Sequence, residues 1–313
     1  MFWFLNQVLK KPQYLKEVYF LFRQKQNKKM IQALNLFFDI SELCLQVCFS
    51  NWSGIWLSFS PGVLLSFSSS FVHLGSDNCK LNSYFITGFF DGEGSFMLVI
   101  RKDNKYSIGY SVQVVIQIEL HKKDRALLEL IQSTWGVGVI VDKKTRDVVS
   151  YTVSRLSDLK VVIAHFEKYP LITQKWADYQ LLKKAFDIIE SKEHLTIEGL
   201  KKLVAIKALI NWGLSEELKA AFPLTSSMIK QIDRPIVVNQ KIKDPYWLAG
   251  FTCAEGCVFV DINNSPKSKL GQAVNLRFLL TQHNRDTQLL ISFINYLDCG
   301  RLKQLSKRDL VVF

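Results

Sequence analysis

The sequence predicts a mixed α+β protein that contains two copies of one αββαββα unit. Three observations lead to this class. Of the 313 residues, 48% are hydrophobic and 22% are charged, which is enough apolar material for a real core. Segments with the alternation of half-buried strands stand between segments with helical periodicity. The stretch YFITGFFDGEGSFMLVI, which starts at Tyr84, returns as YWLAGFTCAEGCVFVDI at Tyr246, 162 positions later.

The elements of the first copy follow from their hydrophobic period. The clearest strand is 110–120, where Val114, Ile116 and Ile118 fall on one face and the other face is polar apart from Val115. This pattern is typical of a sheet with one face against helices and one face in water. Pro170 ends the last helix of the unit. The expected elements are helix 83–92, strands 95–101 and 110–120, helix 122–134, strands 137–142 and 148–153, helices 157–169, 174–191, 196–211 and 215–221, and a connector to about residue 245.

The spacing between the two copies stays constant through strands and loops. Gly88 matches Gly250, Glu93 matches Glu255, His121 matches His283, Asp124 matches Asp286 and Gly138 matches Gly300. A constant offset of this kind indicates a true internal repeat. We expect a leader over residues 1–82, a first domain over 83–235 and a second domain over 236–313. The second copy stops 13 residues after Gly300, so we expect it to be incomplete at its C-terminal end.

The first 82 residues differ from the rest of the chain. They begin with a basic, apolar stretch, and residues 43–76 carry no charge. The best membrane-spanning window, Leu43–Phe59, is marginal because Gln46, Asn51 and several serines dilute it. We favour a dispensable leader, either a targeting sequence or a translated upstream segment. A membrane protein anchored by this window is the alternative.

The charge of the chain indicates a polyanionic partner. There are 40 Lys and Arg against 28 Asp and Glu, a net charge of +12. Such an excess favours nucleic acid or an acidic membrane surface. Residues 1–82 hold 8 basic and 4 acidic residues, which leaves +8 on the repeats. The six cysteines are too scattered for a disulfide scaffold, and Cys253 and Cys257 have no partner pair that would complete a zinc site.

The start of each copy predicts a metal site. Gly88 with Gly92, and Gly250 with Ala254, place small residues four apart on one helix face, so two such helices can pack closely about a pseudo-twofold axis. Glu93 and Glu255 would then meet and repel each other unless cations lie between them. Mg²⁺, with the carbonyls of Gly92 and Ala254 as further ligands, fits this site and suits hydrolysis of two phosphodiesters. The alternative is that each glutamate merely ends a helix in solvent.

The two repeated motifs, ITGFFDGEG and LAGFTCAEG, resemble the signatures of the LAGLIDADG homing endonucleases. The stretches LHKKD, STWGVGVI, HFEKYPLITQKWADY, HLTIEGL, IKALINWGLSEELKAAF and TQHNRD are similar to the single-chain, two-motif subgroup of fungal mitochondrial introns. This resemblance runs from about residue 81 to the end. It implies a monomeric, mitochondrial, Mg²⁺-dependent enzyme that cuts a long double-stranded DNA site during intron homing. A non-cleaving protein, either a maturase that binds the host intron RNA or a degenerate remnant, is the alternative.

The resemblance also implies roles for individual residues. Glu93 and Glu255 become the metal-binding acids, and the polar faces of two sheets become a DNA-binding saddle. An active-site lysine is expected after Gly300, where Lys303 and Lys307 are nearby but Leu305 stands at the aligned position. Position six of the signature is Asp91 in one copy and Cys253 in the other. The implied DNA-contacting residues are Ser95, Arg101, Lys105, Ser111, Gln113, Gln117, Glu119, Lys143, Asp261, Asn275, Arg277 and Thr281.

Overall fold

The computed structural model describes residues 80–211, 213–223, 232, 234–237, 239–266, 271–305 and 308–313. These residues fall into two compact units, which we call the first unit (80–239) and the second unit (240–313). The expected leader, with its window Leu43–Phe59, lies outside the described residues except for residues 80–82. No helix in the described ranges is both long enough and apolar enough to cross a membrane.

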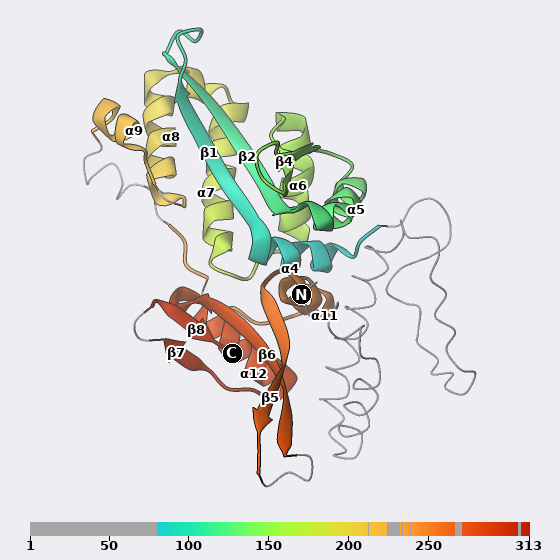
Figure 1. The fold of residues 1–313 in the computed structure, drawn as a ribbon. Coiled ribbons are helices and arrows are strands. Elements are labelled where there is room, and N and C mark those ends of the chain that lie inside the picture. Colours follow the sequence, from blue (N-terminus) through green and yellow to red (C-terminus); the bar gives the residue numbers. More distant parts are fainter. Residues whose placement is uncertain are drawn as a thin grey trace, which may run out of the picture. The chain divides into compact units, whose positions relative to one another are not determined.

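The first unit is an antiparallel four-stranded sheet with helices packed on one face (Figure 1). The strand order is β1-β2-β4-β3, so β1 and β3 are edge strands. Its strands are β1 (Gly94–Lys102), β2 (Tyr110–His121), β3 (Val139–Asp142) and β4 (Val148–Val153). Its helices are α4 (Ser83–Glu93), α5 (Arg125–Trp135), α6 (Leu156–Lys168), α7 (Lys175–Glu190), α8 (Ile197–Leu209) and α9 (Glu216–Ala221), with short 3₁₀ turns at Lys122–Asp124 and Glu193–Leu195.

The core of the first unit is an aromatic cluster between the sheet and its helices. The Phe166 ring lies 5.0 Å from the Phe90 ring and 5.6 Å from the Tyr179 ring, measured between centroids. Phe96 and Trp135 complete the cluster. All five side chains are buried. Because large aromatic side chains bury the most apolar area, they contribute a major part of the stability of this unit.

The second unit repeats this arrangement with strand order β5-β6-β8-β7 (Figure 1). The prediction of two α+β copies is therefore confirmed, and each copy contains an antiparallel four-stranded sheet. The core holds Trp247, Phe251, Phe293 and Phe313. The elements are α11 (Pro245–Glu255), β5 (Gly256–Asn264), β6 (Gln272–His283), a 3₁₀ turn (Asn284–Asp286), α12 (Thr287–Leu297), β7 (Lys303–Leu305) and β8 (Leu310–Val312).

Two pairs of repeated residues have structural roles. Nδ1 of His121 accepts a hydrogen bond from the Lys123 amide at 3.1 Å, and Nδ1 of His283 accepts one from the Arg285 amide at 3.2 Å. Each histidine thereby caps the 3₁₀ turn that follows a long strand. Gly138 and Gly300 have φ angles of 87° and 92°, a region that favours glycine. A side chain at either position would also meet an aromatic ring, that of Tyr151 or Phe313.

The structure differs from the sequence-based expectation in a few boundaries. The expected helix 122–134 is a 3₁₀ turn followed by α5, because the His121 cap tightens the first residues. The expected strand 137–142 begins only at Val139, because the positive φ of Gly138 interrupts extended backbone. The connector between the units is anchored to the first unit. The Arg234 guanidinium donates to the Asp178 carboxylate and to the Leu209 carbonyl, both at 2.6 Å.

Candidate functional site

The two repeated acids occupy the same place in their units. Helix α4 begins after Asn82, whose side chain accepts from the Tyr84 amide at 2.8 Å, and ends at Glu93. Helix α11 begins after Asp244, which accepts from the Tyr246 amide at 2.8 Å, and ends at Glu255. A carboxylate at a helix C-terminus faces the negative end of the helix dipole, which is unfavourable by about 0.3–1 kcal/mol. An acid kept in this place in both units indicates a function other than helix stability.

Each acid is followed directly by a glycine and a strand. A side chain at Gly94 would collide with the Phe90 ring, and one at Gly256 would lie 2.5 Å from the Thr252 carbonyl oxygen. The glycines therefore let the helix end pack tightly against the start of the strand. Glu93 is exposed and Glu255 is half-buried, so both carboxylates have solvent access. Glu93 belongs to the first unit and Glu255 to the second, and their pairing stays a prediction.

The side-chain ammonium of Lys175, a residue that the sequence did not indicate as functional, lies at the C-terminal end of α4. Lys175 is the first residue of α7. Its Nζ donates to the Gly92 carbonyl at 2.7 Å and to the Phe90 carbonyl at 3.0 Å. Both carbonyls lie in the last turn of α4, at the negative end of the helix, where a cation is favourable; the Phe90 carbonyl also accepts from the Gly94 amide. The Gly92 oxygen, which we expected to bind the metal, thus has a cationic partner and keeps a second lone pair.

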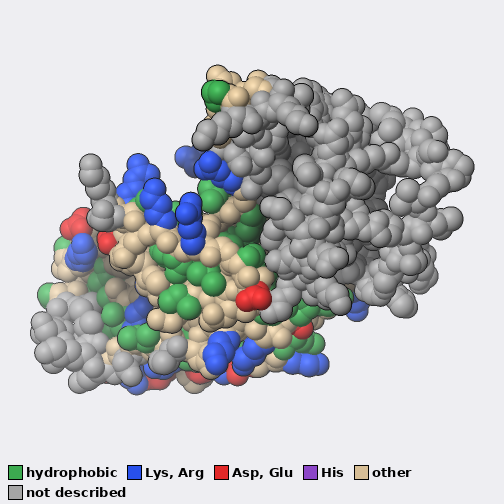
Figure 2. All heavy atoms as spheres, turned by 90° about the horizontal axis from the view of Figure 1, so that it is seen from below, with side chains coloured by type: hydrophobic (Ala, Val, Ile, Leu, Met, Phe, Trp, Pro, Cys, Tyr) green, Lys and Arg blue, Asp and Glu red, His purple; other side chains and the backbone are tan. Residues whose placement is uncertain are grey.

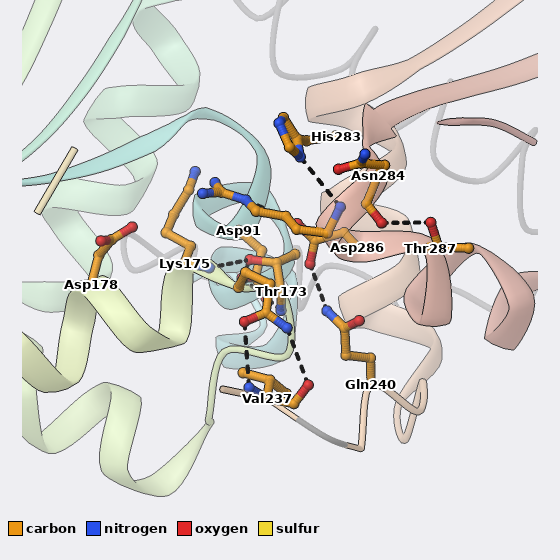
Figure 3. A network of polar contacts seen from close by, with 12 residues as sticks. Asp91, Thr173, Lys175, Asp178, Val237, Gln240, His283, Asn284, Asp286 and Thr287 are labelled. Carbon is orange, nitrogen blue, oxygen red and sulfur yellow. Dashed lines mark hydrogen bonds and ion pairs between the residues drawn. The ribbon is translucent and has the colours of Figure 1, made fainter. Parts of the chain in front are cut away.

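Asp91 holds the segment that carries Lys175 (Figure 3). Its buried carboxylate accepts hydrogen bonds from the Ile172 amide at 3.0 Å, the Thr173 amide at 3.3 Å and the Thr173 hydroxyl at 2.5 Å. The Thr173 hydroxyl oxygen in turn accepts from the Lys175 amide at 3.2 Å. Asp91 therefore fixes the start of α7 against α4. The equivalent residue in the second unit is Cys253, a half-buried thiol.

Helix α4 has one further polar anchor in the first unit. The Thr87 hydroxyl lies 3.0 Å from Nε2 of His165 on α6 and 3.1 Å from the Tyr169 carbonyl. Burial lowers the pKa of the His165 imidazole from its ordinary value of 6.5 to about 4. The ring is therefore neutral at physiological pH, and it serves as a fixed hydrogen-bonding partner of the motif helix.

No three His, Cys, Asp or Glu side chains in the described ranges gather closely enough to hold a metal ion. Mg²⁺ does not require such a cage, because it keeps several waters and binds through one or two carboxylates together with substrate phosphates. The oxygen donors predicted from the sequence, Glu93 and Glu255 with the carbonyls of Gly92 and Ala254, are hard ligands of the kind that Mg²⁺ prefers.

The polar face of the first sheet brings most of the predicted DNA-contacting residues together. The register pairs Ser95 with Gln117 and Arg101 with Ser111, and Gln113 follows on the same face. Lys105 and Lys143 stand in the connections after β1 and β3, outside the strands that the sequence predicted. Arg101 and Lys105 are exposed and form no ion pair with other described residues. They extend the face with positive charge at one end.

Three predicted contact residues are bound to one another. The Gln117 amide nitrogen donates to the Glu119 carboxylate at 2.7 Å and to the Ser150 hydroxyl at 2.5 Å. Lys143 forms an ion pair with the same Glu119 carboxylate. Sequence reasoning missed Ser150 and Thr152 on this face, although the alternation of β4 with the buried Val149, Tyr151 and Val153 could have revealed them.

The second unit has the same kind of face. The register places the backbone of Asp261 opposite Asn275, and the side chains of these two residues lie outside the described part of the structure. Arg277 and Thr281 are exposed on β6. Lys303, the first residue of β7, is exposed and pairs with Val312. Lys307, the other candidate for the active-site lysine, lies outside the described residues.

Basic and apolar side chains share the surface. Figure 2 shows lysine and arginine side chains in small groups on the face in view, with hydrophobic side chains exposed between them. This face therefore offers both positive charge and apolar contact area to a partner.

The chain matches the model of a protein family described as LAGLIDADG endonuclease over residues 86–186 and 248–313. It is 36% identical over 253 residues to "Probable intron-encoded endonuclease 3" of Neurospora crassa, a match that covers 80% of this chain and 46% of the relative. The chain therefore spans about half the length of this curated relative.

The chain is also similar to solved structures of meganucleases. The meganuclease I-CpaMI bound to uncleaved DNA is 42% identical with a TM-score of 0.69, and the match covers 75% of this chain and 79% of that one. The I-SmaMI homing endonuclease bound to cleaved DNA is 40% identical with a TM-score of 0.71, and the match covers 76% and 78% of the two chains.

Proposed function

Because the chain belongs to the LAGLIDADG endonuclease family, we propose that it is a site-specific DNA endonuclease of the intron-homing type. The observation that carries the proposal is the repeated acid at the C-terminal end of the first helix in both units. Neither helix gains stability from it, and each acid directly precedes the strand that leads onto a polar sheet face.

We propose that Glu93 and Glu255 together hold Mg²⁺, with the carbonyls of Gly92 and Ala254 as neighbouring oxygen donors. The metal supplies an activated water and charge stabilisation for phosphodiester hydrolysis when it is bound. The related I-SmaMI has been observed with its uncleaved target in the presence of calcium ions, which supports a divalent cation at such a site. Lys175 holds a positive charge beside Glu93, where it offsets the helix dipole and the charge of a nearby phosphate.

The two sheet faces bind the DNA. Arg101 and Lys105 in the first unit and Arg277 in the second unit contact phosphates or guanines, since these exposed cations suit either partner. We propose that residues 83–235 and 236–313 each form one half of a DNA-binding saddle in a monomeric protein. We also propose a mitochondrial location for this protein.

The direct test is cleavage of intronless target DNA by the full chain in Mg²⁺. The wild type should cut both strands, and E93Q and E255Q should each lose cutting by about a thousandfold or more while DNA affinity stays within about twofold, because the metal supplies several kcal/mol of transition-state stabilisation. E217Q, which changes an exposed glutamate of α9, is the matched control and should cut normally. Collapse of binding in both acid variants would show that the acids are structural.

Lys175 is tested in the same assay. K175M should reduce the cleavage rate by about 100-fold at saturating DNA, at the lower end of the roughly 100- to 1,000-fold that one fixed electrostatic partner supplies. K184M, at an exposed lysine of the same helix, should leave the rate unchanged. Equal losses in the two variants would contradict the role of Lys175.

The alternative function is nucleic-acid binding without cleavage, either as a maturase on the host intron RNA or as a remnant of an endonuclease. Binding of the DNA target with no nicking in Mg²⁺ by the wild type would establish this alternative. Acceleration of intron splicing by the chain would then separate a maturase from a remnant.

A further inference from the structure

Two exposed valines stand on the polar face of the first sheet. Val139 and Val141 on the edge strand β3 are 54% and 55% exposed. The register pairs Val139 with Thr152 and Val141 with Ser150, and Thr152 is in turn paired with Gln117. Paired residues of an antiparallel ladder lie on the same face. The valines therefore face the side on which the DNA-contacting residues lie.

The polar groups beside these valines are largely satisfied within the protein. Gln117 donates to Glu119 and to Ser150, and Ser150 lies 3.3 Å from the Thr152 hydroxyl. Lys143 is paired with Glu119. A base that approached this part of the sheet would meet methyl groups before it met an uncommitted hydrogen-bonding group.

The second unit carries different chemistry at the equivalent positions. The offset of 162 residues relates Val139 to Arg301 and Val141 to Lys303. The registers agree, because Val141 pairs with Ser150 in β4 and Lys303 pairs with Val312 in β8 at the same offset. Lys303 is the first residue of β7, Arg301 stands two residues before this strand, and both are exposed. One backbone position therefore presents an aliphatic group in the first unit and a cation in the second.

These two chemistries correspond to different base edges in the major groove. Apolar side chains contact the C5-methyl group of thymine, whereas Arg and Lys bind O6 and N7 of guanine. Residues two apart in a strand are separated by about 6.6 Å, close to two base-pair steps of about 3.4 Å each. Val139 and Val141 thus match methyl groups on bases two positions apart.

We propose that the edge strands make the two half-sites of the DNA target chemically unlike. Val139 and Val141 read thymine methyl groups in the half bound by the first unit, and Arg301 and Lys303 read guanine in the half bound by the second. This inference rests on the proposed DNA-binding function and adds to it the kind of base recognised. An alternative use of an exposed apolar edge strand is pairing with a second copy of the chain.

The experiment first selects bound duplexes from a randomised pool with the full chain in calcium. Thymine at two positions in one half, two steps apart, is then replaced by uracil, which removes only the methyl group. The wild type should lose affinity by about fourfold per methyl, the equivalent of about 0.8 kcal/mol. In V139A/V141A this penalty should fall below about 1.5-fold. Both side chains are exposed, so the double variant keeps the core intact.

The matched control is K303M, which should keep the uracil penalty and lose the preference for guanine in the other half. In V139R/V141K, selection should shift from thymine to guanine in the first half.

Tolerance of uracil by the wild type, or an equal penalty in V139A/V141A, overturns the inference while DNA binding stands. Absence of all duplex binding overturns the proposed function as well. Self-association that V139A/V141A abolishes, together with uracil tolerance, would assign the valines to a contact between copies.

Discussion

The first and second units share a backbone plan and differ in the chemistry placed on it. Both start with a capped helix that ends in an acid, continue into a long hairpin and close the sheet with a short edge strand. Asp91 is replaced by Cys253, Thr87 by Ala249 and Val141 by Lys303. The shared residues, such as Gly138 and Gly300, meet requirements of the backbone. The differing residues decide how each helix is anchored and which groups each sheet presents.

Substitutions in the two aromatic cores should have the largest effect on the free energy of unfolding. Replacing the fully buried Phe166 by alanine should lower the free energy of unfolding by about 4 kcal/mol, because four other rings of the first core lose contact with it. Phe293→Ala should cost about 3 kcal/mol, since fewer rings surround it. Urea unfolding of the full chain measures both. A larger loss for Phe293 would contradict the view that the first core is the more densely packed.

The second-largest difference in stability between the units is expected at the sixth position of the motif. Asp91→Ala should cost about 3 kcal/mol of unfolding free energy, because two buried backbone amides and a hydroxyl lose their acceptor. Cys253→Ala, at a half-buried thiol, should cost less than about 1 kcal/mol. Thermal unfolding compares the two variants. Similar losses of stability in the two variants would mean that the hydrogen bonds of Asp91 add little beyond side-chain packing.

The anchoring of α4 by His165 should make stability depend on pH. Because the folded-state pKa is about 4 and the unfolded value is 6.5, the unfolded chain binds the proton more readily. The stabilisation is fully present above about pH 6.5 and is lost as the pH falls toward 4. Between about pH 6.5 and pH 5 the loss should be about 1.5 kcal/mol.

Urea unfolding across this pH range tests the prediction, and His165→Gln should flatten the profile. An unchanged slope in His165→Gln would rule out this histidine as its source.

Removal of the helix caps should have the smallest effect on stability, and the effect should be nearly the same in the two units. Asn82→Ala and Asp244→Ala each remove one side-chain acceptor from a helix N-terminus and should each cost about 1 kcal/mol. Their unfolding curves should nearly coincide. A much larger cost for one of them would indicate that its motif helix depends on the cap more than on packing.

Local patterns were sufficient for much of the fold. The alternation in 110–120 predicted β2 and its buried face, and the strand predicted at 148–153 has those bounds in the structure. The 3₁₀ turn at Lys122–Asp124 and the late start of β3 were missed because each depends on one geometric detail, a histidine cap and a positive φ at glycine. The strands predicted at 95–101 and 137–142 already left Lys105 and Lys143 in connections, where the structure places them.

The repeat, the family and the equivalent positions of Glu93 and Glu255 can be recognised from residue identity at a constant spacing. Tertiary structure decided what surrounds them. Lys175 lies 82 positions after Glu93, and only the packing of α7 against α4 brings its ammonium to the helix end. Strand register likewise decided that Val139 and Val141 share a face with Gln117. Contacts between residues distant in sequence leave no local period, so only the folded chain reveals them.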